Sequence, residues 1–323
     1  IGAVFTTMVD VERLELLRGP QGTLYGQNAP GGAYNITTRA PNFDGYNGYI
    51  EGSYSQWDNN GEGRVDTRGA VNIPLIEDKL ALRLAGVYSD SDGDIKMENP
   101  AASHSATGGQ DVQAWRSRML WQVDERTDIN WTVNYQDISQ YQEPFNFDGQ
   151  VPGTGGGSAI PAIYNTFRDR KSYGDFRSEV TGDIKDTNVH VRWGDEDAWI
   201  DGIAYYQSYD SQSDDNREPY PGGLGLFKIG LDTDLTTFEI RYSSEGEKIS
   251  YLTGLYYLYS KAVSDTTVTL TGVEVAQDAK GTTESYAAYA NGTIHLGPQW
   301  DLSLGARYDY NESTLDSNVG FLE

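Results

Sequence analysis

Side chains of alternating polarity run through most of this chain, and this period of two constrains its fold more than any other feature. In the run INWTVNYQ, residues 129–136, apolar and aromatic side chains alternate with polar ones. The same pattern returns in TTFEIRYS, 236–243, and in WDLSLGARYDY, 300–310. A period of two places the two sets on opposite faces of an extended strand. The sequence therefore predicts an all-β protein whose strands each have one apolar face.

Segments with this strand pattern are mostly close to ten residues long. They span 49–57, 63–73, 79–89, 112–123, 128–138, 184–193, 198–209, 234–243, 249–260, 283–294 and 300–310. A tilted strand needs about 9–11 residues to cross a bilayer. These eleven segments therefore have the length expected of transmembrane strands.

The connections between the strand segments alternate in length. Those after the second, fourth, sixth, eighth and tenth segments are short, such as DERT at 124–127 and GDED at 194–197. Those after the third, fifth, seventh and ninth are long and polar, and only DNNGE, 58–62, after the first segment departs from this rule. Outer-membrane barrels have short turns at one end and long loops at the other, whereas a soluble sandwich has no reason to sort its loops in this way. We therefore predict a transmembrane antiparallel β-barrel.

Composition agrees with a protein that meets two solvents. The 23 tyrosines outnumber the 9 phenylalanines and 7 tryptophans, so much of the apolar mass lies in amphipathic rings. No run approaches the ~20 apolar residues of a membrane helix, so any membrane span must be made of strands. The formal charge of -24 opposes nucleic acid through phosphate repulsion. Because the chain has no cysteine, it has no disulfides and no thiolate metal ligands.

Strand alternation also predicts which side chains face lipid and which face the lumen of the barrel. The predicted lipid-facing set is Ile129, Trp131, Val133, Tyr135, Phe238, Ile240, Tyr242, Leu302 and Leu304. The predicted lumen-facing set is Asn130, Asn134, Glu239, Arg241 and Asp301. Charged and amide side chains belong in the lumen because a charge at the bilayer midplane costs about 2–4 kcal/mol.

The N-terminal stretch VERLELLRGPQGTLYGQNAPGGAYNITTRAP, residues 11–41, concentrates five glycines between two strand-like runs. Glycine permits positive φ and close approach of another backbone, so the stretch predicts two strands joined by tight turns. A phosphate-binding loop is the competing interpretation. It is disfavoured because neither Gly-Lys-Ser/Thr nor a helix pattern follows the glycines.

This stretch resembles the end of the plug domain of TonB-dependent outer-membrane receptors. The motif positions that match include Arg18, Gly19, Pro20, Tyr25, Gly26, Gly31, Gly32 and Asn35. Pro30 and Tyr34 depart from the usual residue types, while 237–258 and 284–310 resemble barrel segments of the same family. The resemblance implies that residues 1–43 are the C-terminal part of a plug domain and that 44–323 are the N-terminal half of a barrel. Plugged transporters have about 22 strands, so we expect a partial barrel of about half that number.

The resemblance also implies a function, a set of partners and a location. A TonB-dependent receptor of the bacterial outer membrane imports a large, scarce nutrient, most often a ferric siderophore. Its expected partners are the TonB energy-transducing complex, the small-molecule ligand and outer-membrane lipid, with no nucleic acid and no cofactor. A passive porin and a surface-exposed adhesin are the alternatives, and the plug motif argues against the porin.

Other residue clusters do not indicate an enzyme or a metal site. DSDGD, 90–94, lacks the later Gly and Glu of an EF-hand loop. His104, His190 and His295 are far apart in sequence, so zinc is not indicated. No Ser/His/Asp arrangement is visible, and no carboxylate pair stands out for glycoside hydrolysis. We therefore expect no catalytic residue, no bound metal and no enzymatic activity.

Aromatic residues in the long connections are the candidate ligand contacts. Rings offer a large contact area at low entropic cost. The candidates are Tyr141, Tyr164, Tyr173 and Tyr220. The alternative is that these rings pack the loops against each other.

A lock between plug and barrel is implied by the family resemblance. An arginine beside the Gly-Pro turn is expected to bind glutamates of the inner barrel wall. We therefore expect Arg18 to pair with Glu239, with Glu12 or Glu15 and Arg241 as neighbours. The alternative is that Arg18 only satisfies backbone carbonyls within the plug.

Overall fold

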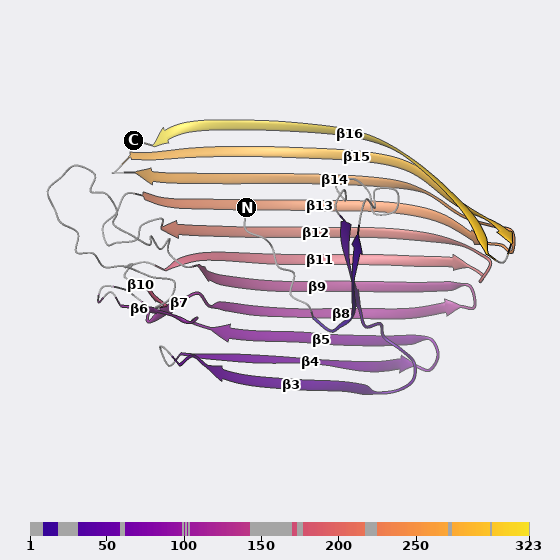
Figure 1. Ribbon diagram of the computed structural model, residues 1–323, viewed down its shortest axis with the longest axis horizontal. Coiled ribbons are helices and arrows are strands. Elements are labelled where there is room, and N and C mark those ends of the chain that lie inside the picture. Colours follow the sequence, from indigo (N-terminus) through magenta and orange to yellow (C-terminus); the bar gives the residue numbers. More distant parts are fainter. Residues whose placement is uncertain are drawn as a thin grey trace.

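One antiparallel sheet of eleven strands dominates the computed structural model (Figure 1). The structure describes residues 9–18, 32–58, 62–98, 100, 102, 104–142, 170–172, 177–216, 225–270, 273–297 and 299–322. The sheet contains β3 (Asn47–Gln56), β4 (Gly63–Ile76), β5 (Leu80–Ser91), β8 (Gln110–Asp124), β9 (Thr127–Gln142), β11 (Ser178–Gly194), β12 (Ala198–Asn216), β13 (Gly225–Glu245), β14 (Ile249–Leu270), β15 (Val273–Gly297) and β16 (Trp300–Leu322). Each strand pairs with the next of this series, which is the up-and-down order of a barrel wall.

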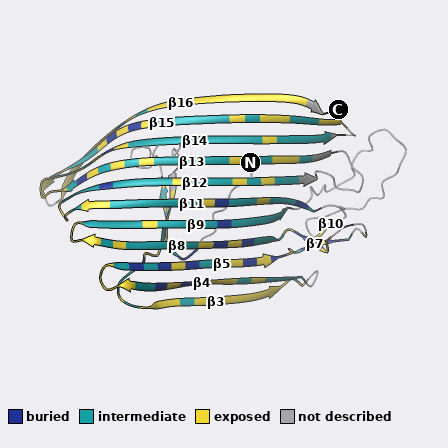
Figure 2. Cartoon of the chain, turned by 180° about the vertical axis from the view of Figure 1, so that it is seen from behind, coloured by how far each residue is buried: buried dark blue, intermediate teal, exposed yellow. Residues whose placement is uncertain are grey.

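The turns at one end of the sheet are short, as predicted. The connections β4–β5, β8–β9, β11–β12, β13–β14 and β15–β16 each contain only two or three residues, and all of them lie at the same end (Figure 1). We call this the turn end and the opposite one the loop end. Figure 2 shows that the edge strand β16 is exposed along most of its length, because it pairs on one side only.

The connections at the loop end differ in part from the prediction. The prediction of a long loop at 261–282 is wrong, because β14 and β15 continue until only residues 271–272 separate them. The loop expected at 210–233 shrinks in the same way to 217–224. The strand length needed to cross a bilayer is a minimum, and a paired backbone remains satisfied in water beyond it. Polar, β-branched runs such as TTVT, 266–269, favour strand without needing an apolar face.

Two connections at the loop end are long, as predicted, and they pair with each other. The first, 92–109, carries β6 (Ile95–Met97) and β7 (Ala106–Thr107), and the second, 143–177, carries β10 (Lys171–Ser172). These three short strands form a separate sheet in the order β10-β6-β7, with β10 parallel to β6. The two connections are therefore joined although they are far apart in sequence.

The N-terminal stretch forms a hairpin, as predicted, from β1 (Val11–Arg18) and β2 (Gly32–Thr38). Residues 19–31 between them lie outside the described part of the chain. The hairpin runs across the direction of the wall strands (Figure 1). We call the face of the wall that carries it the inner face.

The faces predicted from alternation are confirmed by the register of the sheet. Arg116 contacts both Val9 in front of the hairpin and Asn134, so Asn134 points inward and its neighbours Val133 and Tyr135 point outward. The unbroken pairing from β9 to β16 carries the same parity across the wall. The apolar sets of β9, β13 and β16 therefore lie on the outer face. Among the described residues, no helix has the length and apolarity needed to span a membrane.

Candidate functional site

A buried ion pair fastens the start of the hairpin to the wall. Asp10 lies directly before β1, and its Oδ2 is 2.5 Å from Nε of Arg83 on β5, while its Oδ1 accepts a 2.8 Å hydrogen bond from the same guanidinium. The two side chains are only 3% and 5% exposed. The hydroxyl of Tyr49 on β3 also donates to Asp10 at 3.3 Å. This bidentate geometry is the strongest form of arginine–carboxylate contact, and it joins residues 73 positions apart.

Two further arginines hold backbone carbonyls at the base of the hairpin. Arg116 donates from Nη1 to the carbonyl of Val9 at 2.7 Å, and Arg118 donates from Nη1 to the carbonyl of Thr38 at 3.1 Å. Both come from β8, two positions apart, so strand alternation turns them to the same face. Val9 lies just before β1 and Thr38 is the last residue of β2. The wall therefore binds the start and the end of the hairpin.

The link from the hairpin to the first wall strand is fixed by one buried amide. Asn72 on β4 is fully buried and accepts a hydrogen bond from the backbone N–H of Asn42 at 3.0 Å. Its Nδ2 donates to the carbonyls of Asn42 and Gly45 at 3.0 and 2.9 Å. These polar contacts of the hairpin and its link come from β3, β4, β5 and β8, at one side of the wall.

The predicted lock residues lie on different elements and have other contacts. Arg18 ends β1 opposite Gly32, and Glu239 on β13 accepts a hydrogen bond from the Tyr289 hydroxyl. Arg241 lies 3.9 Å from Asp201, which also binds His190 at 2.6 Å and Arg192 at 3.0 Å. The pairing of Arg18 with Glu239 stays a prediction.

The motif residues that the structure describes stabilise the hairpin itself. Asn35 on β2 donates from Nδ2 to Glu15 on β1 at 2.8 Å, and the two residues are directly paired. The remaining motif positions Gly19, Pro20, Tyr25, Gly26 and Gly31 lie outside the described residues.

The one predicted ligand contact within the described residues, Tyr141, braces the loop end of the wall. Its hydroxyl donates to Asp111 on the neighbouring strand, and the guanidinium carbon of Arg177 lies 3.4 Å from its ring centroid. Its backbone exchanges hydrogen bonds with Gly108 and Gly109, each at 3.0 Å. These contacts agree with the loop-packing alternative, while ligand contact stays a prediction. Tyr164, Tyr173 and Tyr220 lie outside the described residues.

Ion pairs join the two long connections at the loop end. Asp94 pairs with Arg170, Glu98 with Lys171 at 3.2 Å, and Asp92 with Arg177 at 3.5 Å. In each pair the acid comes from 92–109 and the base comes from 143–177. We call these three pairs the loop clasp.

The loop clasp is expected to weaken in acid through Glu98. Hydrogen bonds from Lys96 and Lys171 hold the pKa of Glu98 below its usual range, so its contribution is present above the unfolded pKa and is lost as pH falls through the folded one. A nitroxide on Ser105→Cys should gain mobility in this acidic window, measured by electron paramagnetic resonance.

Glu98→Gln should show the raised label mobility already at pH 7 and should respond less to acid. Glu125→Gln, in a turn at the opposite end, is the matched control and should behave like the parent. Equal mobility in Glu98→Gln and the parent would show that the pair does not hold the connections together.

Comparison with known proteins agrees with this architecture. A family model described as "TonB dependent receptor-like, beta-barrel" matches residues 121–321. The pesticin receptor of Yersinia enterocolitica is 23% identical over 325 residues, which cover 98% of this chain and 44% of that receptor. The ferrioxamine receptor of Yersinia enterocolitica is 24% identical over 254 residues, covering 73% of this chain and 31% of that receptor.

Solved structures share the fold. The ferric yersiniabactin uptake receptor of Yersinia pestis has a TM-score of 0.78 at 21% identity, covering 97% of this chain and 46% of that one. The ferric-catecholate import receptor of E. coli K12, in its open form, has a TM-score of 0.72 at 14% identity, covering 98% and 52%. This chain thus spans about half the length, or less, of the relatives that it matches. Because the family model covers more than half of the 323 residues, and the wall has the turns and order of these barrels, the chain belongs to the TonB-dependent receptor family of outer-membrane β-barrels.

Proposed function

We propose that this chain is part of an active importer of ferric siderophores. Family membership supports a receptor of the outer membrane, and similar proteins carry names that refer to ferrioxamine and ferric yersiniabactin. The observation that carries the proposal is the hairpin across the inner face, because a transporter must close its lumen between transport events. A passive porin needs an open lumen instead.

We further propose that residues 1–43 belong to a plug and residues 44–323 to the first half of the barrel that surrounds it. Several polar contacts hold the hairpin: an ion pair, two arginine–carbonyl bonds and one buried asparagine. The apolar contact of Val9 with Ala70, Ala85 and Ala114 of the wall is small beside them. Polar contacts can exchange protein partners for water when the plug is pulled, so the cost of leaving is lower than for an equivalent apolar interface. This suits a seal that a TonB complex opens by force.

The predicted lock and ligand residues are part of this proposal. Arg18, Glu239 and Arg241 would add polar contacts between the plug and the β13 side of the wall, opposite the anchored side. The tyrosines of the loop-end connections would offer rings to the ligand, and the loop clasp would carry two of these connections as one unit. The adhesin alternative needs only the loops and gives the hairpin no role.

Energy-dependent uptake is the expected result for the full-length receptor. Cells that express it in a strain without other siderophore receptors should accumulate iron-55 from ferric yersiniabactin or ferrioxamine, and a protonophore should abolish this uptake. Purified receptor in planar bilayers should not conduct small ions. Steady conductance without a ligand would favour the porin, and loss of attachment with unchanged iron uptake after gene deletion would favour the adhesin.

A further inference from the structure

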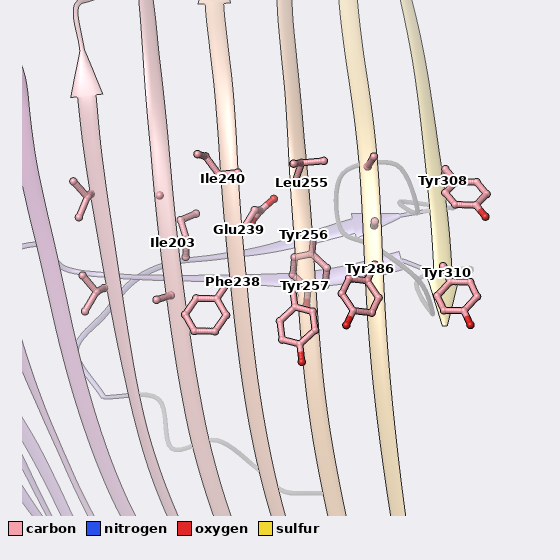
Figure 3. A pocket seen from close by; sticks show the side chains of 16 residues that line it. Ile203, Phe238, Glu239, Ile240, Leu255, Tyr256, Tyr257, Tyr286, Tyr308 and Tyr310 are labelled. Atoms are coloured by element: carbon pink, nitrogen blue, oxygen red, sulfur yellow. The ribbon is translucent and has the colours of Figure 1, made fainter. Parts of the chain in front are cut away.

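The outer face of the wall carries an apolar groove between β11 and β16 (Figure 3). Its volume is about 740 Å³. Bulky side chains of Val189, Ile240 and Leu255 flank it. The small residues Gly202, Ala204 and Ala288 leave the hollow between them. This groove is set into a sheet whose backbone is fully paired, so its shape is present before anything binds.

The groove opens toward lipid and not toward the lumen. Glu239 and Tyr289, which contact each other, point to the inner face, so Phe238, Ile240 and Ala288 beside them point outward. The hollow is therefore continuous with the outward apolar band of the barrel. In a bilayer the medium that meets this band is hydrocarbon.

A second hollow extends the groove toward the turn end. It has a volume of about 560 Å³ and shares Ile240, Leu255, Ala288 and Tyr308 with the first. Ala290 and Ala306 continue its line of small side chains. The two hollows together give an elongated slot, which suits a flexible chain better than a compact molecule.

A row of four rings marks the end of the groove nearer the loops. Phe238, Tyr257, Tyr286 and Tyr310 are directly paired across four neighbouring strands. Ring centroids are 6.4 Å apart for Phe238 and Tyr257, and 5.0 Å apart for Tyr257 and Tyr286. The hydroxyls of the three tyrosines point away from Ile240 and Leu255, toward the loop end (Figure 3). Rings with an apolar body and a polar tip belong at the boundary between acyl chains and head groups.

We propose that this groove is a binding site for one acyl chain of an outer-leaflet lipid. The chain lies along the small residues toward the turn end, and its head group lies beside the tyrosine hydroxyls. The long connections are extracellular in barrels of this kind. The tyrosine row lies toward that end of the wall, so the head group belongs to the outer leaflet. A lipid chain in a preformed groove contacts the wall on more sides than a chain on a smooth surface. It therefore exchanges with neighbouring lipids more slowly. This site does not depend on which ligand the receptor transports.

Photolabelling of the full-length receptor tests the site. The receptor is reconstituted in vesicles of phosphatidylglycerol that contain a fraction of the same lipid with a diazirine on its acyl chain. Labels should concentrate on Gly202, Ala288 and Ala290 over Trp131 and Val133, which face the same lipid outside the groove.

A filled groove provides the decisive variant. Ala288→Trp should remove the labels from the groove and leave those on Trp131 and Val133 unchanged. Leu304→Trp adds the same ring to the outer face beyond both hollows and is the matched control, which should label like the parent. Even labelling of the whole outer face, or unchanged groove labels in Ala288→Trp, would overturn the proposal. Cross-links between two copies through the groove would overturn it as well, because they would assign the surface to a protein interface.

Discussion

Replacing Arg83 with alanine is expected to loosen the hairpin and open the lumen to small solutes. The substitution leaves Asp10 as an uncompensated charge that is 3% exposed, and breaking a buried pair from one side typically costs about 3–5 kcal/mol. Arg116 and Arg118 still bind the base of the hairpin, so the barrel should assemble in normal amount. The measurement is sensitivity of cells to a large antibiotic such as vancomycin, together with ion conductance of the purified receptor.

Three comparisons separate a loosened hairpin from a damaged barrel. Asp10→Ala should produce a similar leak, and the double variant Asp10→Ala with Arg83→Ala should leak less than the two single effects added together, because neither charge is then left unpaired. Arg126→Ala removes an exposed pair with Asp195 at the turn end, where such pairs are worth about 0–1 kcal/mol, and it should not leak. An intact seal in Arg83→Ala at normal receptor level would show that this pair is not what holds the hairpin.

The sequence predicted the wall well because a barrel strand repeats one simple physical rule. Every second side chain of such a strand contacts lipid, so the alternation in 129–136 and 300–310 indicates both the strand and its two faces. Short turns were equally visible because polar and glycine residues interrupt the alternation for only a few positions. The loop end was harder to predict. Beyond the bilayer both faces of a strand meet water, so alternation is no longer required. Residues 261–282 therefore have the pattern of a loop, although 261–270 and 273–282 continue the ladder.

The anchors of the hairpin were missed although a signal was present. Arg83 stands in LALRLAGVY, 80–88, and Arg116 and Arg118 stand in WRSRM, 115–119, each within a predicted transmembrane strand. An arginine at that depth must face the lumen, and a lumen-facing arginine needs an acceptor. Which acceptor it finds depends on where the chain places the hairpin, and pairing over 73 residues leaves no local pattern. The family motif indicates Arg18 instead, because it contains residues of the plug and none of the wall.

Leu304→Arg is expected to destabilise the barrel through its outer face. Leu304 is 66% exposed in the isolated wall and lies on β16 four residues after Trp300 and six before Tyr310. These two rings mark the boundaries of the apolar band, so Leu304 lies near its middle. An arginine at the midplane of a barrel costs about 2–4 kcal/mol, which should lower the urea midpoint of the full-length receptor in vesicles and reduce its level in the membrane.

Ser303→Arg places the same side chain one position earlier, on the inner face, and is the matched control. Ser303 shares a 2.9 Å hydrogen bond with Thr293 of the neighbouring strand, so the control loses one hydroxyl contact but gains access to the aqueous lumen. We expect its unfolding midpoint to remain close to that of the parent. The difference between the two variants isolates the direction of the side chain, since strand, depth and charge are nearly the same. If Ser303→Arg were the more damaging substitution, the faces of β16 would be reversed, and by the continuous register of the sheet so would the faces assigned to every strand from β9 onward.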